Sequence, residues 1–580
     1  MKELFASRLM SRLVMPAMAM LFIAGCAGVP SEESGQIPNT AQAPVSAAKA
    51  SNPRALPPGV LYRLLSAEFA ARRGNPHAAI ATYMDVARET RDAGVAERAT
   101  RMAVYARDEP AGRDAAKLWV ELADNLEAYR VYAVLLVRAG ETEAALGALG
   151  TIVERFDNGN GDAFRVVAEL LNRDRNKERR VVLMEQFVAE YPDSVPAQSA
   201  LAQVAARAGQ VEKASAILKG LYEADPTDET HAAFYASLLR NQGKMEEALA
   251  LLKGQVERRP GGREMRMLYA RFLVDAKRYE DAQAQFQHLA KAFSERSDIR
   301  YALGLLLLQT NHHDAARPHF EALVKLGEQT LQANFYLGRI AEAQEKPEEA
   351  IGFYRRVDRG EHYLNAQIRV AAIYADMGKL NRARQHLSVV RRNNAGDDIR
   401  LYRAEAELLA RSDDIDGAIG VYDVALKTHP KNTDLLYARA MLAARVERFE
   451  ILERDLRDIL TREPNNADAL NALGYTLADR DDRVEEAYDL IKRALALKPE
   501  DHYIIDSMGW VLYRLGRLED AVTYLKKALS IKADAEVAAH LGEVLWVLGR
   551  KDEAREVWDT ALKDTPQDKR LLETIERLSR

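Results

Sequence analysis

From Val60 to its end, the chain carries an apolar pattern of helical period that is interrupted at short, regular intervals. Apolar residues that recur every three to four positions predict amphipathic helices. Prolines interrupt this pattern in two series with spacings of 34 or 35 residues: Pro192, Pro226 and Pro260, and then Pro430, Pro464 and Pro499. Proline cannot continue a helix, so each one predicts the end of one helical unit and the turn into the next.

Small residues recur with the same period inside the helical pattern. In the last three units they are Gly474, Gly509 and Gly542 in a first helix and Ala487, Ala521 and Ala554 in a second, with spacings of 33 to 35 residues. Side chains this small allow two helices to approach closely, and larger ones fill the gap between successive units. We expect this filling from Phe286, Phe320, Tyr354 and Trp558. The pattern predicts helical hairpins that stack into one solenoid.

These marks follow a known order. Leu-Gly stands in the first helix, alanine opens the second and proline closes the unit, as at Leu303-Gly304, Leu337-Gly338, Leu473-Gly474 and Leu541-Gly542. The order resembles the tetratricopeptide repeat. The resemblance implies an all-α, right-handed superhelix of about fifteen hairpins. We expect degenerate hairpins at 59–191, a central array at 192–466, regular repeats at 467–568 and a capping helix at 569–580.

Two stretches depart from the pattern. Between Thr90 and Tyr191 the marks are sparse, although Gly112, Gly140 and Ala144 still indicate hairpins. Leu452 occupies a position where the repeat usually has alanine. A larger side chain there is expected to widen the local packing.

The first 58 residues have a different composition. Lys2, Arg8 and Arg12 precede an apolar run from 13 to 23, which is too short to span a bilayer and is typical of a signal peptide, 1–25. The run ends in Ile-Ala-Gly-Cys at Cys26, the only cysteine of the chain. This ending resembles the bacterial lipobox, which implies a lipidated Cys26 and, with Ala27 following it, the periplasmic face of the outer membrane of a Gram-negative cell. Residues 26–58 are rich in Pro, Ala and Ser, which predicts a disordered linker.

Composition and motifs exclude several classes of function. The net charge is −5 and both signs are interspersed, so no basic excess indicates nucleic-acid binding. No metalloprotease, serine-hydrolase or phosphate-loop motif occurs, and we predict no catalytic, cofactor or metal residue. The histidine group at 312, 313 and 319 is interpreted as turn and helix-start residues, with a weak metal site as the alternative. Residues 157–162 lack the glutamate of a calcium loop and predict a turn. The Asp pairs at 413–414 and 481–482 are interpreted as helix caps.

The resemblance also implies a binding surface, because the first helices of tetratricopeptide arrays line the concave side. Counted from the Leu-Gly marks, eight residues of the last three units are expected there: Asn471, Tyr475, Tyr503, Asp506, Trp510, Tyr513, Glu543 and Trp546. Aromatic side chains that are partly exposed on a rigid scaffold often anchor a protein partner. The alternative is that they pack inside the superhelix.

The runs 471–480, 506–516 and 540–546 resemble large outer-membrane tetratricopeptide lipoproteins of proteobacteria of the LbcA type. That resemblance implies a non-enzymatic adaptor that binds a periplasmic carboxyl-terminal processing serine protease of the CtpA type and presents protein substrates such as peptidoglycan hydrolases. The alternative is an assembly factor for a secretin, a pilus or an exopolysaccharide export complex. A third class, an enzyme acting on cell-wall or sugar substrates, is disfavoured because no catalytic motif is found.

Overall fold

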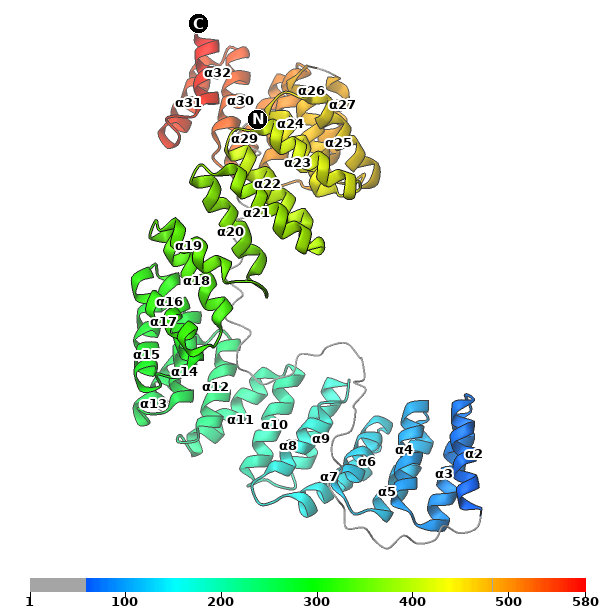
Figure 1. Ribbon diagram of the computed structural model, residues 1–580. Helices are drawn as coiled ribbons and strands as arrows, with labels where there is room; N and C mark the ends of the chain where they lie inside the picture. Colours follow the sequence, from blue (N-terminus) through cyan, green and yellow to red (C-terminus); the bar gives the residue numbers. More distant parts are fainter. Residues whose placement is uncertain (1–58, 482) are drawn as a thin grey trace. The chain divides into compact units, whose positions relative to one another are not determined.

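The computed structural model describes residues 59–481 and 483–580 (Figure 1). These residues form 31 α-helices and one short 3₁₀ turn, η1 (Ala395–Asp397), and they contain no strand. The predicted all-α tetratricopeptide solenoid is therefore confirmed. The predicted signal peptide, Cys26 and the linker 26–58 lie outside the described residues.

The helices divide into two compact units, whose described parts are 59–328 and 329–580. The first contains α2 (Val60–Arg72), α3 (Pro76–Thr90), α4 (Ala93–Ala106), α5 (Glu109–Leu122), α6 (Leu126–Ala139), α7 (Thr142–Phe156), α8 (Asp162–Leu171), α9 (Lys177–Val188), α10 (Val195–Ala208), α11 (Val211–Ala224), α12 (Glu229–Asn241), α13 (Met245–Arg258), α14 (Arg263–Asp275), α15 (Tyr279–Ala292), α16 (Ser297–Gln309) and α17 (His313–Leu326).

The second unit contains α18 (Thr330–Ala343), α19 (Pro347–Arg355), α20 (Tyr363–Asp376), α21 (Leu380–Asn393), α22 (Asp398–Arg411), α23 (Ile415–Thr428), α24 (Thr433–Arg445), α25 (Phe449–Arg462), α26 (Ala467–Asp479), α27 (Val484–Leu497), α28 (His502–Arg514), α29 (Leu518–Ile531), α30 (Ala535–Val547), α31 (Lys551–Asp564) and α32 (Lys569–Ser579).

Within each unit, every helix packs against its neighbours in the sequence. Even-numbered helices are the first and odd-numbered helices the second of each hairpin, so α2 to α31 make fifteen pairs and α32 closes the array. This agrees with the predicted number of hairpins. The stretch 59–191 is built of the same helical pairs, although its repeat marks are sparse. The boundary between the units falls between two hairpins, after α17.

The prolines lie where the period predicted them. Five of the six, all except Pro192, stand two residues beyond the end of a second helix: Pro226, Pro260, Pro430, Pro464 and Pro499. A polar residue often follows and caps the next first helix, as the Asn466 side chain accepts a hydrogen bond from the Ala469 N–H at 3.0 Å. The capped N–H would otherwise lack a partner inside the helix.

The turn within a hairpin needs one residue of left-handed backbone. Glycine fills this position in several hairpins, for example Gly516 with φ 75°, whereas Asp413 and Asp481 adopt it with φ near 60°. The next residue, Asp414, caps α23 through the Gly417 N–H at 2.9 Å. The interpretation of the first Asp pair as turn and cap residues is thus confirmed. Asp482 lies outside the described residues.

Glycine in the first helix meets a large side chain of the second. A Cβ placed on Gly304 would lie 2.8 Å from the Phe320 ring, and one on Gly338 would lie 2.6 Å from the Tyr354 ring. The four side chains that were expected to fill the gap between successive units are all buried: Phe286, Phe320, Tyr354 and Trp558. Phe320, Tyr354 and Trp558 lie against the glycine of the first helix of their own hairpin. Helix approach and ring size are therefore matched within each hairpin.

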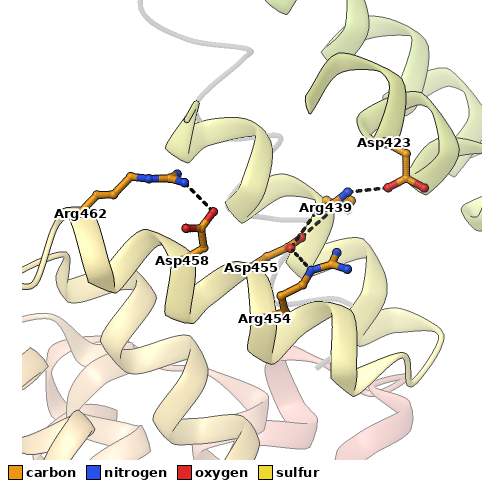
Figure 2. A network of polar contacts seen from close by, with 6 residues as sticks. All are labelled: Asp423, Arg439, Arg454, Asp455, Asp458 and Arg462. Atoms are coloured by element: carbon orange, nitrogen blue, oxygen red, sulfur yellow. Dashed lines mark hydrogen bonds and ion pairs between the residues drawn. The ribbon is translucent and has the colours of Figure 1, made fainter. Parts of the chain in front are cut away.

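The hairpin at the irregular Leu452 holds a buried ion pair (Figure 2). Arg439 of α24 donates two parallel hydrogen bonds to the Asp455 carboxylate of α25, at 2.7 and 2.8 Å, and a third at 2.5 Å to Asp423 of α23. Asp455 also accepts from Arg454 at 3.1 Å. Leu452 itself is buried. Charged groups therefore join three helices in this hairpin and the one before it.

Candidate protein-binding surface

The structure places the eight predicted residues on the first helices of the last three hairpins. Asn471 and Tyr475 lie on α26, Tyr503, Asp506, Trp510 and Tyr513 on α28, and Glu543 and Trp546 on α30. Helices α26 and α28 pack together, and α28 packs on α30. The predicted side chains therefore share a region of the fold, and its geometry decides which of them a partner could reach.

A histidine that sequence reasoning missed lies at the centre of this region. His540 of α30 donates a hydrogen bond from Nδ1 to Asp506 Oδ1 at 2.9 Å. Its ring stacks on Trp510 with centroids 4.2 Å apart, and its Nε2 lies 3.5 Å from the Tyr475 hydroxyl. One side chain thus contacts α26 and α28 from α30. Asp506 and His540 are 34 residues apart, which is about one repeat. This spacing of two polar residues was the sequence signal from which a contact between neighbouring first helices could have been inferred.

Burial and charge act in opposite directions on this histidine. Burial lowers the pKa of His540, but the negative charge of Asp506 and the hydrogen bond to it raise the pKa more strongly, so the net shift is upward. Burial also raises the pKa of Asp479 on α26 against the opposing effects of His540 and Arg514. The region therefore favours a protonated imidazole between carboxylates.

The closing helix α32 adds two arginines to the same region. Arg577 donates to Glu543 Oε2 at 2.5 Å, and Glu543 also accepts from the Tyr513 hydroxyl at 3.3 Å. Arg570 forms an ion pair with Glu536, the second acidic group of α30. Through these two arginines, α32 is tied to both acidic side chains of α30.

Five of the eight residues are only 4–9% exposed: Asn471, Tyr475, Asp506, Trp510 and Glu543. The expectation that they are open to a groove is therefore wrong, and the alternative of packing inside the superhelix describes them. The physical reason is the close approach of the first helices, which brings Tyr475 into contact with His540, 65 residues later.

The other three predicted residues stay partly exposed: Tyr503, Tyr513 and Trp546. Trp546 stacks on Trp558 with centroids 5.6 Å apart, and Lys551 and Arg555 lie over its ring. The rings of Tyr503, Tyr513 and Trp546 are partly exposed on packed helices, as aromatic anchors for a protein partner are. That they bind a partner stays a prediction.

No group of three or more His, Cys, Asp or Glu side chains in 59–481 and 483–580 is arranged to hold a metal ion. His312 lies in the turn before α17 and contacts the Thr310 hydroxyl at 2.9 Å, and His313 begins the helix. Burial lowers the pKa of His319, which lies further along α17. At 157–162, the Ala163 N–H donates to Asp157 at 3.2 Å within the turn between α7 and α8. His312, His313 and residues 157–162 thus have the turn or helix-start positions that the sequence predicted, whereas the interpretation is wrong for His319, which is partly buried in the middle of α17.

Family comparisons agree with this architecture. Tetratricopeptide repeat profiles match residues 301–362, 437–502 and 512–578, and a profile of anaphase-promoting complex subunit 3 matches 209–289. The chain is 42% identical to the TPR repeat-containing protein PA4667 of Pseudomonas aeruginosa over 487 residues, which are 83% of this chain and 82% of that protein. The chain belongs to the tetratricopeptide repeat protein family. As a member, it is a scaffold of the type that mediates protein–protein interaction.

Other likenesses of this tetratricopeptide repeat protein are weaker. It is 24% identical over 168 residues to the human protein O-mannosyl-transferase TMTC1, which is 28% of this chain and 19% of that protein. Among solved structures, a tetratricopeptide repeat protein from Parabacteroides merdae is 14% identical and covers 43% of this chain and all of its own, with a TM-score of 0.35. The Naa15/Naa10 complex with HypK is 14% identical and covers 90% of this chain and 96% of its own, also with a TM-score of 0.35.

Proposed function

We propose that the protein is a non-enzymatic adaptor of the bacterial envelope. It binds a periplasmic carboxyl-terminal processing serine protease and presents protein substrates to it, among them peptidoglycan hydrolases. The observation that carries this proposal is the set of fifteen hairpins in the described residues, divided between two compact units that could each offer a surface to a protein. The likeness of 471–480, 506–516 and 540–546 to adaptor lipoproteins of the LbcA type supports the choice of a protease as the partner.

The proposed location is the periplasmic face of the outer membrane, with lipidated Cys26 as the anchor. Its support is the lipobox-like sequence Ile-Ala-Gly-Cys and the Ala27 that follows it. Within the described ranges, no helix has the length and apolar character needed to cross a bilayer.

The proposed mechanism is physical rather than chemical. The adaptor holds a protease on one surface and a substrate on another, which makes their encounter intramolecular. Effective concentrations in such arrangements reach about the millimolar range for short linkers. The adaptor then raises the rate of cleavage without contributing a reactive group of its own.

The proposal is tested in two steps. Capture of the detergent-solubilised lipoprotein from the envelope, followed by mass spectrometry, should retain a carboxyl-terminal processing protease. Recovery of a secretin, pilus or polysaccharide-export component instead would favour the assembly role. In the second step, purified adaptor is added to the purified protease and a peptidoglycan hydrolase. Faster cleavage is expected, and unchanged turnover across a range of adaptor concentrations would refute the adaptor role.

A further inference from the structure

The two ends of the helical array differ in their outer surfaces. At the C-terminal end, α32 turns polar residues outward, including Glu573 and Glu576, with Leu572 as its one large exposed apolar side chain. At the N-terminal end, α2 exposes four large apolar side chains: Leu61 (58%), Tyr62 (75%), Leu65 (50%) and Phe69 (57%). Terminal repeats of solenoids normally carry a polar outer face that keeps them soluble. Among the described helices, α2 therefore has a more apolar outer face than α32.

These four side chains form one stripe, called here the α2 stripe. Leu61, Leu65 and Phe69 follow one another at intervals of four residues, and Tyr62 precedes Leu65 by three, so all lie on one side of the helix. No other described helix exposes more than two large apolar side chains. Two exposed arginines, Arg72 and Arg73, end the stripe. Along α2, the interior face packs on α3.

We propose that the α2 stripe lies on the surface of a phospholipid bilayer and forms a second, non-covalent membrane contact of this protein. The stripe runs along a single helix of 13 residues, about 20 Å long, and places large apolar side chains next to two arginines at the helix end. Leucine and phenylalanine enter the acyl boundary, the tyrosine sits at the headgroup level, and the arginines reach anionic headgroups.

Two observations favour a bilayer over a protein as the occupant. The stripe is one helix wide, and a fluid surface accommodates it without a matching groove. The predicted lipid anchor, Cys26, also precedes α2 in the sequence, so α2 is the described helix nearest to that anchor along the chain. The inference rests on the proposed envelope location. Its consequence is that the first hairpin is held flat against the membrane.

The test uses the lipid-free chain that begins at Ala27, so that no acyl group contributes to binding. Flotation with vesicles of phosphatidylethanolamine and phosphatidylglycerol should recover the wild-type chain with the lipid. The triple variant Leu61→Ser, Leu65→Ser, Phe69→Ser should bind at least about tenfold more weakly. The double variant Arg72→Gln, Arg73→Gln should bind these vesicles about fivefold more weakly for each arginine removed. Its binding to phosphatidylcholine vesicles should be almost unchanged relative to the wild type.

A matched control separates the stripe from general surface apolarity. Val389→Ser, Val424→Ser and Ile531→Ser change three side chains that are 43–50% exposed on other helices, and this variant should bind vesicles like the wild type. Equal thermal unfolding of both triple variants shows that the array is intact. Absence of wild-type flotation overturns the proposal. Sedimentation that shows an α2-dependent dimer without vesicle binding, or α2-dependent capture of the protease without vesicle binding, also overturns it. Failure of the protease test leaves the flotation result unchanged.

Discussion

His540 and Asp506 lie on the first helices of successive hairpins, α30 and α28, and their side chains meet in a buried contact of 2.9 Å between Nδ1 and Oδ1. His540 also reaches Tyr475, which lies two hairpins earlier. In this array the inward polar positions of the last hairpins thus hold first helices to one another. A partner that binds here meets a pre-formed polar network with partly exposed rings nearby.

The first prediction concerns pH. Burial lowers the pKa of His540, but Asp506 raises it to above its ordinary value of 6.5. A histidine with a raised pKa in the folded state binds its proton more tightly there than in the unfolded chain. Its contribution to stability is complete below pH 6.5 and is lost as pH rises through the folded pKa. The free energy of unfolding of the wild type in urea should therefore decline as pH rises above about 6.5.

Asp506→Asn provides the control for this effect. It removes the charge that raises the pKa of His540, so the decline above neutral pH should flatten. Loss of one member of a buried pair should also cost on the order of 3 kcal/mol at acidic pH. Asp479 titrates from a lower ordinary value, 3.8, and its raised pKa gives a decline that begins at lower pH. An identical slope above pH 6.5 in the wild type and Asp506→Asn would assign that slope to another group.

The second prediction concerns helix approach. A Cβ on Gly542 would overlap the indole of Trp558, which is buried in the same hairpin. Gly542→Ala should therefore lower the free energy of unfolding by about 2 kcal/mol. Gly420, inside α23, has nothing within 4 Å of an added Cβ, so Gly420→Ala should raise stability by about 0.5–1 kcal/mol through helix propensity. Urea unfolding of both variants measures these two changes in the free energy of unfolding. If both variants were stabilised or both destabilised, the contact with Trp558 would not be what distinguishes Gly542 from Gly420.

The repeat architecture could be predicted from the sequence because each mark has a local physical cause. Pro464 ends a unit whatever surrounds it, and the pair Gly338 and Tyr354 sets its own helix spacing. The number of hairpins followed from the same marks. These effects act within one or two helices, and a repeat of 34 residues contains two helices, so they can be recognised from the repeat pattern alone.

The exposure of the candidate surface could not be predicted in the same way. Trp510 lies on a first helix, α28, as expected, but its burial depends on the ring of His540, one hairpin later, and on how closely α26, α28 and α30 approach. The arginines of α32 were expected only as part of a polar closing helix. Their partners, Glu536 and Glu543, depend on how the last helix docks, and no local pattern encodes this.

The third prediction concerns the network in Figure 2. Arg439→Met leaves the almost fully buried Asp455 without its main partner, and should cost about 3–5 kcal/mol. Arg439→Met combined with Asp455→Leu removes both charges and should recover most of that loss, because two apolar side chains suit the buried site. The double-mutant cycle in urea gives the coupling. Additive losses would mean that the two residues stabilise the fold independently.

The last prediction separates core from contact at the C-terminal hairpins. Trp510 is buried against His540, so Trp510→Ala should lower the free energy of unfolding by about 3–5 kcal/mol. Trp546 is partly exposed, so Trp546→Ala should cost less stability and should weaken capture of the protease in a pull-down. Val547→Ala changes an exposed apolar neighbour and serves as the matched control. If Trp546→Ala captures the protease as well as Val547→Ala does, the partner binds elsewhere on the array, and the rings of α28 and α30 serve packing alone.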